Sequence, residues 1–298
     1  MNSKASIKPL IIIIGVNLLW GIDFIAIEYM MHYMSPAVFT LCRLAIGALL
    51  LLVACFLLRG GLHIERQDML PVLIAGGTGM ALYFTVENLG TGLTSASFSA
   101  LIMATVPIFG MIGDRLVYGN RITPLKVICI LASILGVYLL VQGEPMDINP
   151  LGLVAMFAGA ILWVFYIIYT KTLFDKYDLL TLLTGLFLSG LIVQIPLTAI
   201  SQGISHAPVT FTATGVLLTI ATAVICIIVG QFGYVYAIGH LSPTVVSAFE
   251  NVLPVTTVVL SIFIFGKMLT GLQIIGAVLI MLAVTVIAVK GTKDYQLN

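Results

Sequence analysis

The chain has 298 residues, of which 60% are hydrophobic and only 8% are charged, and its formal net charge is +1. Its mean hydropathy is +1.17. Soluble domains carry about a quarter charged residues, so this chain cannot cover a water-exposed surface and belongs with integral membrane proteins. No basic patch stands outside the apolar segments, which excludes a nucleic-acid-binding protein.

Ten apolar segments are long enough to cross a bilayer, which takes about 20 residues each. They cover residues 9–31, 36–58, 69–90, 94–117, 123–142, 149–171, 178–200, 210–237, 242–265 and 270–290. The short connections between them leave no room for an aqueous domain. The sequence therefore predicts an all-α integral membrane protein with ten transmembrane helices, and it argues against most enzymes and against a sensor with an aqueous effector domain.

Basic residues in the loops of membrane proteins concentrate on the cytoplasmic side. With a cytoplasmic N-terminus, eleven of the thirteen basic residues lie inside, Lys267 lies outside and Arg43 lies within a span. We therefore expect both termini to be cytoplasmic. The eleven residues are Lys4, Lys8, Arg59, Arg66, Arg115, Arg121, Lys126, Lys171, Lys176, Lys290 and Lys293.

The chain repeats itself. An offset of 147 residues places Pro107 on Pro254, and an offset of 143 places Trp20 on Trp163. Each half, residues 1–146 and 147–298, then holds five spans. Because five is odd, the second half must enter the membrane upside down relative to the first. Inverted repeats of this kind are typical of secondary transporters, in which one half rocks against the other around a central site.

The motif LLWG (Leu18–Gly21) and the segments TSASFSALIMATVPIFG (Thr94–Gly110) and LSPTVVSAFENVLPVTTVVLSIFIFG (Leu241–Gly266) resemble the EamA branch of the drug/metabolite transporter superfamily. The resemblance covers nearly the whole chain. It implies a ten-helix bundle with a central cavity that moves small metabolites by alternating access. Family members often carry a glutamate where this chain has Asn120 and Lys267, so no role of that carboxylate carries over.

Polar residues recur along the ninth span in the segment SAFENVLPVTT. Ser247, Glu250, Asn251 and Pro254 share one helical face with Thr257 and Ser261, and a polar stripe in a membrane helix faces the bundle or a water-filled cavity. Pro254 also leaves the carbonyl near Glu250 without its usual donor. We expect Glu250 and Asn251 to contact substrate. The alternative is a proline kink beside a protonated, hydrogen-bonded Glu250.

Pro107 holds the matching place in the fourth span. Paired helix interruptions in the two halves indicate the binding site of a transporter. Pro107 and Pro254 are therefore predicted hinges as well as markers of the site.

The third span carries Tyr83 and Glu87 on one face. We expect both to contact substrate, because a buried carboxyl group suits a proton-coupled carrier or a cationic substrate. The alternative is that Glu87 is a solvent-wetted residue at the outer rim. Glycines 76, 77, 79 and 90 of this span are expected to permit close helix approach.

Tyr33 lies in the first predicted turn, and Asp23 and Arg43 stand ten residues before and after it. Antiparallel helices would bring them to equal depth, so we expect a buried ion pair, with direct substrate contact as the alternative. Asp114 and Arg115 are expected to form an interfacial pair at the cytoplasmic end of the fourth span.

Aromatic faces occur on the first span of each half. Asn17, Trp20, Phe24 and Glu28 share a face of the first span. Trp163 and Tyr166 project from its counterpart. Aromatic rings here can stack on a substrate or hold a cation, so we expect Asn17, Trp20, Trp163 and Tyr166 to contact substrate; the alternative is that the rings only pack.

We therefore expect a secondary active transporter of small polar metabolites, with amino acids or related compounds as first choice and export as its direction. An organic-cation or drug carrier coupled to protons is the alternative. No phosphate-binding loop or catalytic constellation is present, so we expect neither direct use of ATP nor an enzyme. The four cysteines show no CxxC spacing and the histidines no metal-ligand spacing, so we predict no metal and no cofactor. The expected setting is a prokaryotic inner membrane, as a monomer or weak homodimer.

Overall fold

The computed structural model describes residues 7–30, 33–93, 101–142, 149–205, 209–256 and 270–295. Every regular element within these ranges is a helix. Seven helical segments in them are long and apolar enough to cross a membrane, and Pro124–Leu140 is a shorter apolar helix. The prediction of an all-α membrane protein is therefore confirmed, while the count of ten spans stays a prediction.

The elements of the first half follow the predicted spans closely. They are α1 (Lys8–Met30), α2 (Pro36–Arg59), the 3₁₀ turn η1 (Arg66–Asp68), α3 (Met69–Gly76), the π segment η2 (Gly77–Leu82), α4 (Tyr83–Leu93), α6 (Val106–Tyr118) and α7 (Pro124–Leu140). Because α3, η2 and α4 follow one another without a break, the third predicted span is one continuous helical rod.

The second half contains α8 (Pro150–Phe174), α9 (Leu179–Ser205), α10 (Ala213–Thr222), the π segment η3 (Ala223–Val229), α11 (Gly230–His240), α12 (Pro243–Phe249) and α14 (Gly271–Tyr295). Here α10, η3 and α11 form one rod, which is the eighth predicted span. The two π segments begin at Gly77 and Ala223, 146 positions apart, close to the repeat offset seen in the sequence. A π turn inserts one extra residue into an α-helix and often marks a functional site.

Four helices begin with the same local signal, a capping residue followed by proline. The capping side chain accepts a hydrogen bond from a backbone N–H of the first turn, and proline needs no such partner at that position. The pairs are Ser35–Pro36, Thr123–Pro124, Asn149–Pro150 and Ser242–Pro243. This signal explains why these helices start within one residue of the predicted spans.

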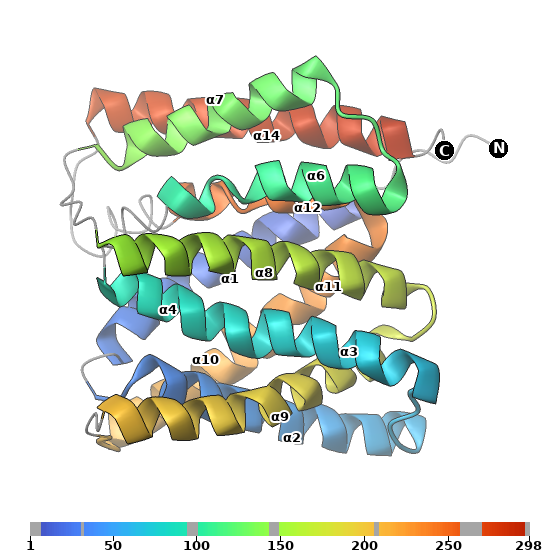
Figure 1. Ribbon diagram of the computed structural model, residues 1–298, viewed down its shortest axis with the longest axis vertical. Coiled ribbons are helices and arrows are strands. Elements are labelled where there is room, and N and C mark those ends of the chain that lie inside the picture. Colours follow the sequence, from blue (N-terminus) through green and yellow to red (C-terminus); the bar gives the residue numbers. More distant parts are fainter. Residues whose placement is uncertain are drawn as a thin grey trace.

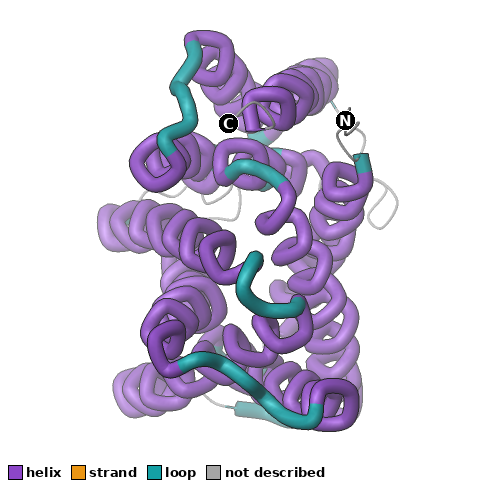
Figure 2. The backbone as a smooth tube through the Cα atoms, turned by 90° about the vertical axis from the view of Figure 1, so that its right-hand side faces the viewer, coloured by secondary structure: helices purple, strands orange, loops and turns teal. Residues whose placement is uncertain are grey.

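The helices lie side by side in a bundle (Figure 1), and an end-on view shows most of them running along the line of sight (Figure 2). Helix α2 packs on α9, α7 on α14 and α6 on α12. Helix α1 packs on α11, and α4 packs on α8. Exchanging the two predicted halves converts each of these contacts into itself or into another of the set, as an inverted repeat requires. The first helix begins and the last helix ends at the same end of the bundle (Figure 1).

Glycines allow the closest helix contacts. A Cβ atom on Gly76 would lie 2.3 Å from the carbonyl oxygen of Leu186 in α9. One on Gly79 would lie 2.3 Å from the ring of Tyr166 in α8, and one on Gly90 would lie 2.6 Å from Met156. The predicted role of the third-span glycines in close packing is confirmed at these positions.

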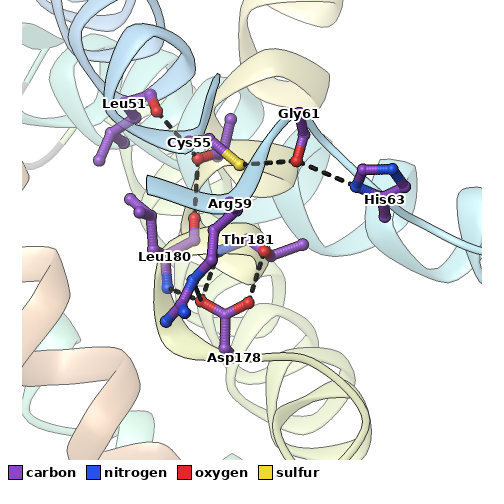
Figure 3. A network of polar contacts seen from close by, with 9 residues as sticks. Leu51, Cys55, Arg59, Gly61, His63, Asp178, Leu180 and Thr181 are labelled. Carbon is purple, nitrogen blue, oxygen red and sulfur yellow. Dashed lines mark hydrogen bonds and ion pairs between the residues drawn. The ribbon is translucent and has the colours of Figure 1, made fainter. Parts of the chain in front are cut away.

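Polar contacts join α2 to α9 at the end of the bundle where α2 finishes (Figure 3). Asp178 caps α9 by accepting hydrogen bonds from the backbone of Leu180 and Thr181, and it pairs with Arg59 at 3.2 Å. Partial burial opposes ionisation of Asp178, but the hydrogen bonds from Thr181 and the charge of Arg59 outweigh it and hold the pKa of that carboxyl below its ordinary value. A second contact, between Lys176 and Asp68 at 2.7 Å, ties the same loop to η1.

The expected interfacial pair of Asp114 with Arg115 is wrong. Asp114 is buried and accepts hydrogen bonds from Asn120 at 2.8 Å and from Thr244 of α12 at 2.5 Å. Arg115 is exposed and donates to the carbonyl oxygen of Gly119 at 2.8 Å. The carboxylate therefore joins α6 to α12, and the arginine helps to end its own helix.

Lys171, expected at the cytoplasmic end of the sixth span, is also buried. Its ammonium group donates to the carbonyl oxygens of Ile238 at 2.9 Å and Leu241 at 2.6 Å. These carbonyls lie at the end of α11, where a cation is favoured because the last carbonyls of a helix have no intrahelical donor. Lys171 thus fastens α8 to α11.

The glycine contacts generate a stability prediction. Gly76→Ala should lower the free energy of unfolding by about 1–3 kcal/mol, because backbone of α9 cannot move away cheaply from the added methyl group. Gly15→Ala is the matched control: nothing lies within 4 Å of its added Cβ, and alanine favours helix. Thermal unfolding of the purified variants in detergent is the measurement, and equal midpoints for the two variants would contradict the packing role of Gly76.

Candidate functional site

Trp163 is the centre of a buried aromatic cluster. Its ring centroid lies 4.4 Å from that of Tyr83, 4.8 Å from Tyr166 and 5.3 Å from Tyr234. The ring of Trp20 is 6.1 Å from Trp163 and 4.9 Å from Tyr234. The structure thus brings together the predicted residues Trp20, Tyr83, Trp163 and Tyr166, which come from α1, α4 and α8.

Two carboxyl groups are attached to this cluster, each through a tyrosine. The hydroxyl of Tyr83 donates to Oε1 of Glu87 at 2.8 Å, and the hydroxyl of Tyr234 donates to Oε1 of Glu250 at 2.6 Å. Glu87 is partly buried and Glu250 is 9% exposed. Each tyrosine also contacts Trp163 through its ring. Glu87 is therefore part of the cluster, and the hydroxyl of Tyr83 holds its carboxyl group there.

The ninth span is interrupted beside Glu250. Helix α12 ends at Phe249, Glu250 and Asn251 form a turn, and the chain is helical again from Val252. The carbonyl of Glu250, which loses its usual donor because Pro254 has no N–H, accepts instead from the backbone N–H of Leu253 at 3.2 Å. The predicted local effect of Pro254 is confirmed, and a tighter turn supplies the missing donor.

The fourth span has a matching interruption. Ala104 and Thr105 form a turn before α6, in which the N–H of Ile108 donates to the carbonyl of Thr105 at 2.9 Å. Pro107 lies in the first turn of α6, where proline is tolerated. Both halves therefore contain a break, two to four residues before the proline that the sequence singled out. Whether Pro107 and Pro254 act as hinges stays a prediction.

Asn251 lies at the contact between three spans. Its Nδ2 donates to Oγ of Ser133 at 2.8 Å and to the carbonyl oxygen of Ala104 at 3.3 Å. Ser247 donates to the carbonyl of Pro243 in its own helix at 2.7 Å. The residues of the predicted polar stripe therefore face different partners. Glu250 faces the aromatic cluster, while Asn251 and Ser247 have protein partners that explain their burial; Thr257 and Ser261 lie outside the described residues.

Asn17 and Trp20 of α1 donate hydrogen bonds to backbone carbonyls. The indole N–H of Trp20 donates to the carbonyl oxygen of Cys226 at 3.1 Å, inside the π segment η3. The Nδ2 of Asn17 donates to Ile13 at 2.8 Å, and the carbonyl of Asn17 accepts from Thr256 at 3.2 Å. The side chains of Phe24, Glu28 and Asn88 lie outside the description.

Asp23 and Arg43 form the predicted buried ion pair, with 2.5 Å between Oδ2 and Nη2 and 5% exposure of each residue. The pair joins α1 to α2. Its formation supports the expected structural pair over the alternative of direct contact with substrate.

Two residues of the cluster were missed from the sequence, Gln231 and Tyr234 of α11. Both are fully buried. The hydroxyl of Tyr166 donates to Oε1 of Gln231 at 2.7 Å. The segment GQFGY does contain a signal, since a glutamine in the middle of an apolar span is costly unless it has a partner. Among the described residues no group of His, Cys, Asp and Glu could hold a metal ion.

The comparisons with known proteins agree with a membrane transporter. The model of the EamA-like transporter family matches twice, over residues 7–142 and 150–289. An uncharacterized transporter of Archaeoglobus fulgidus is 26% identical over 91% of this chain and 95% of its own. The uncharacterized inner membrane transporter YedA of Escherichia coli K12 is 24% identical over 91% of this chain and 87% of its own.

A probable terminal-alkyne amino-acid exporter of Streptantibioticus cattleyicolor is 24% identical over 87% of this chain and 86% of its own. One solved crystal structure has the same fold, with a TM-score of 0.77 at 19% identity over 96% of this chain and 98% of that one.

The Asp23–Arg43 pair generates a prediction. Arg43→Leu should lower the free energy of unfolding by about 3–5 kcal/mol, because it leaves the Asp23 carboxylate buried without a counter-charge. The double variant Asp23→Leu/Arg43→Leu should recover much of that loss and retain transport. Thermal unfolding and uptake by liposomes check this, and a well-folded double variant without transport would instead indicate substrate contact.

Proposed function

Because the chain belongs to the EamA-like transporter family, we propose that it is a secondary carrier of small polar metabolites, with amino acids or related compounds as the first choice and export as the direction. The proposal rests on the meeting of two interrupted helices with a buried cluster of aromatic rings and carboxyl groups. Interruptions near the midplane, one in each half, are where secondary transporters bind substrate.

The proposed substrate contacts are Trp20, Tyr83, Glu87, Trp163, Tyr166 and Glu250. A cluster of large rings offers apolar surface and ring faces to a ligand, and the two carboxyl groups offer acceptors for an amine. Asn17 and Asn251 are also proposed. Asn251 donates to Ser133 and Ala104 of other spans, so its contact with substrate would need those helices to separate. Asn17 donates within its own helix, and its Oδ1 has no hydrogen-bond partner among the described residues.

Alternating access would follow from the two halves, residues 1–146 and 147–298, moving as inverted repeats about Pro107 and Pro254. The exchange-symmetric helix contacts support this division. No part of the motion requires ATP, since the chain has no phosphate-binding loop of the P-loop type. We propose a carrier driven by a proton or substrate gradient, not an enzyme.

Amino acids are favoured because one relative, at 24% identity, is named a probable amino-acid exporter. The second candidate, a proton-coupled carrier of organic cations or drugs, is favoured by a different observation. Glu87 and Glu250 both face Trp163 through their tyrosines, and a ring cluster with two acidic groups suits a cation.

Reconstitution tests the proposal. Purified protein in liposomes, loaded with labelled amino acids or organic cations, should export them at a rate that depends on an imposed proton gradient. Glu250→Gln keeps the hydrogen bond from Tyr234 but fixes the neutral form. We expect this variant to lose the dependence of the initial rate on pH between about pH 5.5 and 8.5, a range that brackets titration of a buried glutamate. Superimposable pH profiles for the two proteins would exclude a coupling role for Glu250.

We propose a multi-pass protein of a prokaryotic inner membrane with both termini in the cytoplasm. Labelling with a membrane-impermeant maleimide tests the orientation. In a variant without native cysteines, Val209→Cys should react from outside, and Asp175→Cys should react only after the membrane is opened. Both positions are exposed in the structure. The reverse labelling pattern would mean that the chain has the opposite orientation.

A further inference from the structure

Gln231 is a buried glutamine with an unused donor. It has no exposed surface, and its Oε1 accepts from Tyr166 at 2.7 Å. Its Nε2 has no hydrogen-bond partner among the described residues. Tyr166 stacks on Tyr234 with 6.3 Å between ring centroids and 6° between the planes, so the carboxamide of Gln231 lies beside the Trp163 cluster.

The indole of Trp163 provides a second donor, whose nearest acceptors are the carboxyl of Glu250 and the hydroxyl of Tyr234. Its Nε1 is buried and makes no hydrogen bond of ordinary geometry. The two donors come from different helices, α11 and α8, and they belong to one cluster; the N–H of Gln231 has no partner, and that of Trp163 becomes available when an amine of the ligand pairs with Glu250. A buried N–H without a partner costs about 1–3 kcal/mol, and inside a membrane no water compensates for it. Such a loss is tolerated where another state of the protein, or a ligand, supplies the acceptor.

Gln194 shows how this chain treats a structural glutamine. It is also fully buried, in α9. Its Nε2 donates to the carbonyl oxygen of Ala37 at 3.2 Å and to Thr198 at 3.1 Å, and its Oε1 accepts from Thr85 at 3.2 Å. Every polar atom of Gln194 therefore has a protein partner, whereas Gln231 keeps a donor free.

The cluster thus combines two kinds of polar group. Glu87 and Glu250 are acceptors that suit an amine, and the N–H groups of Gln231 and Trp163 are donors that suit a carboxylate. A ligand that matches both carries an amine and a carboxylate on a largely apolar body.

We propose that Gln231 is the specificity-determining residue of the site, and that its Nε2, together with Nε1 of Trp163, binds the carboxylate of a zwitterionic substrate. This inference rests on the proposed carrier function. Tyr166 positions the amide: its hydroxyl holds Oε1, which leaves the N–H end for the ligand. Gln231 then separates amino acids from amines that lack the carboxylate.

Ligand binding by the purified full-length chain in nanodiscs tests the proposal. The probes are two matched pairs, L-leucine with 3-methylbutylamine and L-phenylalanine with 2-phenylethylamine, and wild type should bind an amino acid more tightly than its amine. Gln231→Met removes the donor at similar length, and Gln231→Glu replaces it with an acceptor. Both variants should bind the amino acid about 10- to 100-fold more weakly, the loss of one hydrogen bond to a charged group, while the amine retains its affinity.

Gln194→Met is the matched control, because it removes an equally buried amide whose partners are all protein groups. It should lower the unfolding temperature without changing the ratio of amino-acid to amine affinity. A purely structural Gln231 would behave in the same way, so an unchanged ratio in both Gln231 variants overturns the inference. So does a wild type that prefers the amine. A wild type that neither binds nor transports any of the four probes would instead contradict the proposed amino-acid carrier itself, and the inference with it.

Discussion

The need to satisfy every backbone polar group without water governs this structure. In hydrocarbon an unpaired carbonyl costs roughly several kcal/mol. A helix can therefore break only where a nearby group donates a hydrogen bond to the freed carbonyl. The backbone N–H of Leu253 donates to the carbonyl of Glu250, and the indole N–H of Trp20 donates to the carbonyl of Cys226 in a π segment. Both of these carbonyls lie beside the aromatic cluster, because Glu250 accepts a hydrogen bond from Tyr234 and the ring of Trp20 packs on that tyrosine.

The cluster depends on both halves of the chain. Trp163 comes from α8, but its neighbours come from α1, α4 and α11. Small residues make this possible: a side chain on Gly79 would collide with Tyr166, and one on Gly230 would collide with Trp20. Close approach at these glycines brings the tyrosine–glutamate pairs of the two halves against one indole. Movement of one half against the other would necessarily alter the contacts of Trp163.

Residues of one helix face, or of neighbouring helices joined by a short turn, could be predicted from the sequence. Tyr83 with Glu87 follows from helical periodicity, and Asp23 with Arg43 from equal distances to a turn. Contacts across the bundle could not be predicted, because they depend on which helices touch. Asp114 meets Thr244, 130 positions away, so its neighbour Arg115 was the wrong partner. For the same reason the contacts of Asn251 with Ser133 and Ala104 could not be predicted, and Gln231 was missed.

The π segments η2 and η3 set the rotation of the two helical rods that contain them. Each residue of an α-helix turns the chain by about 100°, so the extra residue of a π turn rotates everything that follows. In the eighth span, Gln231 and Tyr234 follow η3 directly, and in the third span Tyr83 and Glu87 follow η2. Removing one residue from either segment would leave the composition and hydropathy of the span almost unchanged, yet it would turn the polar face towards lipid. The rotational phase of these helices is therefore encoded by two irregular turns and not by the pattern of apolar residues.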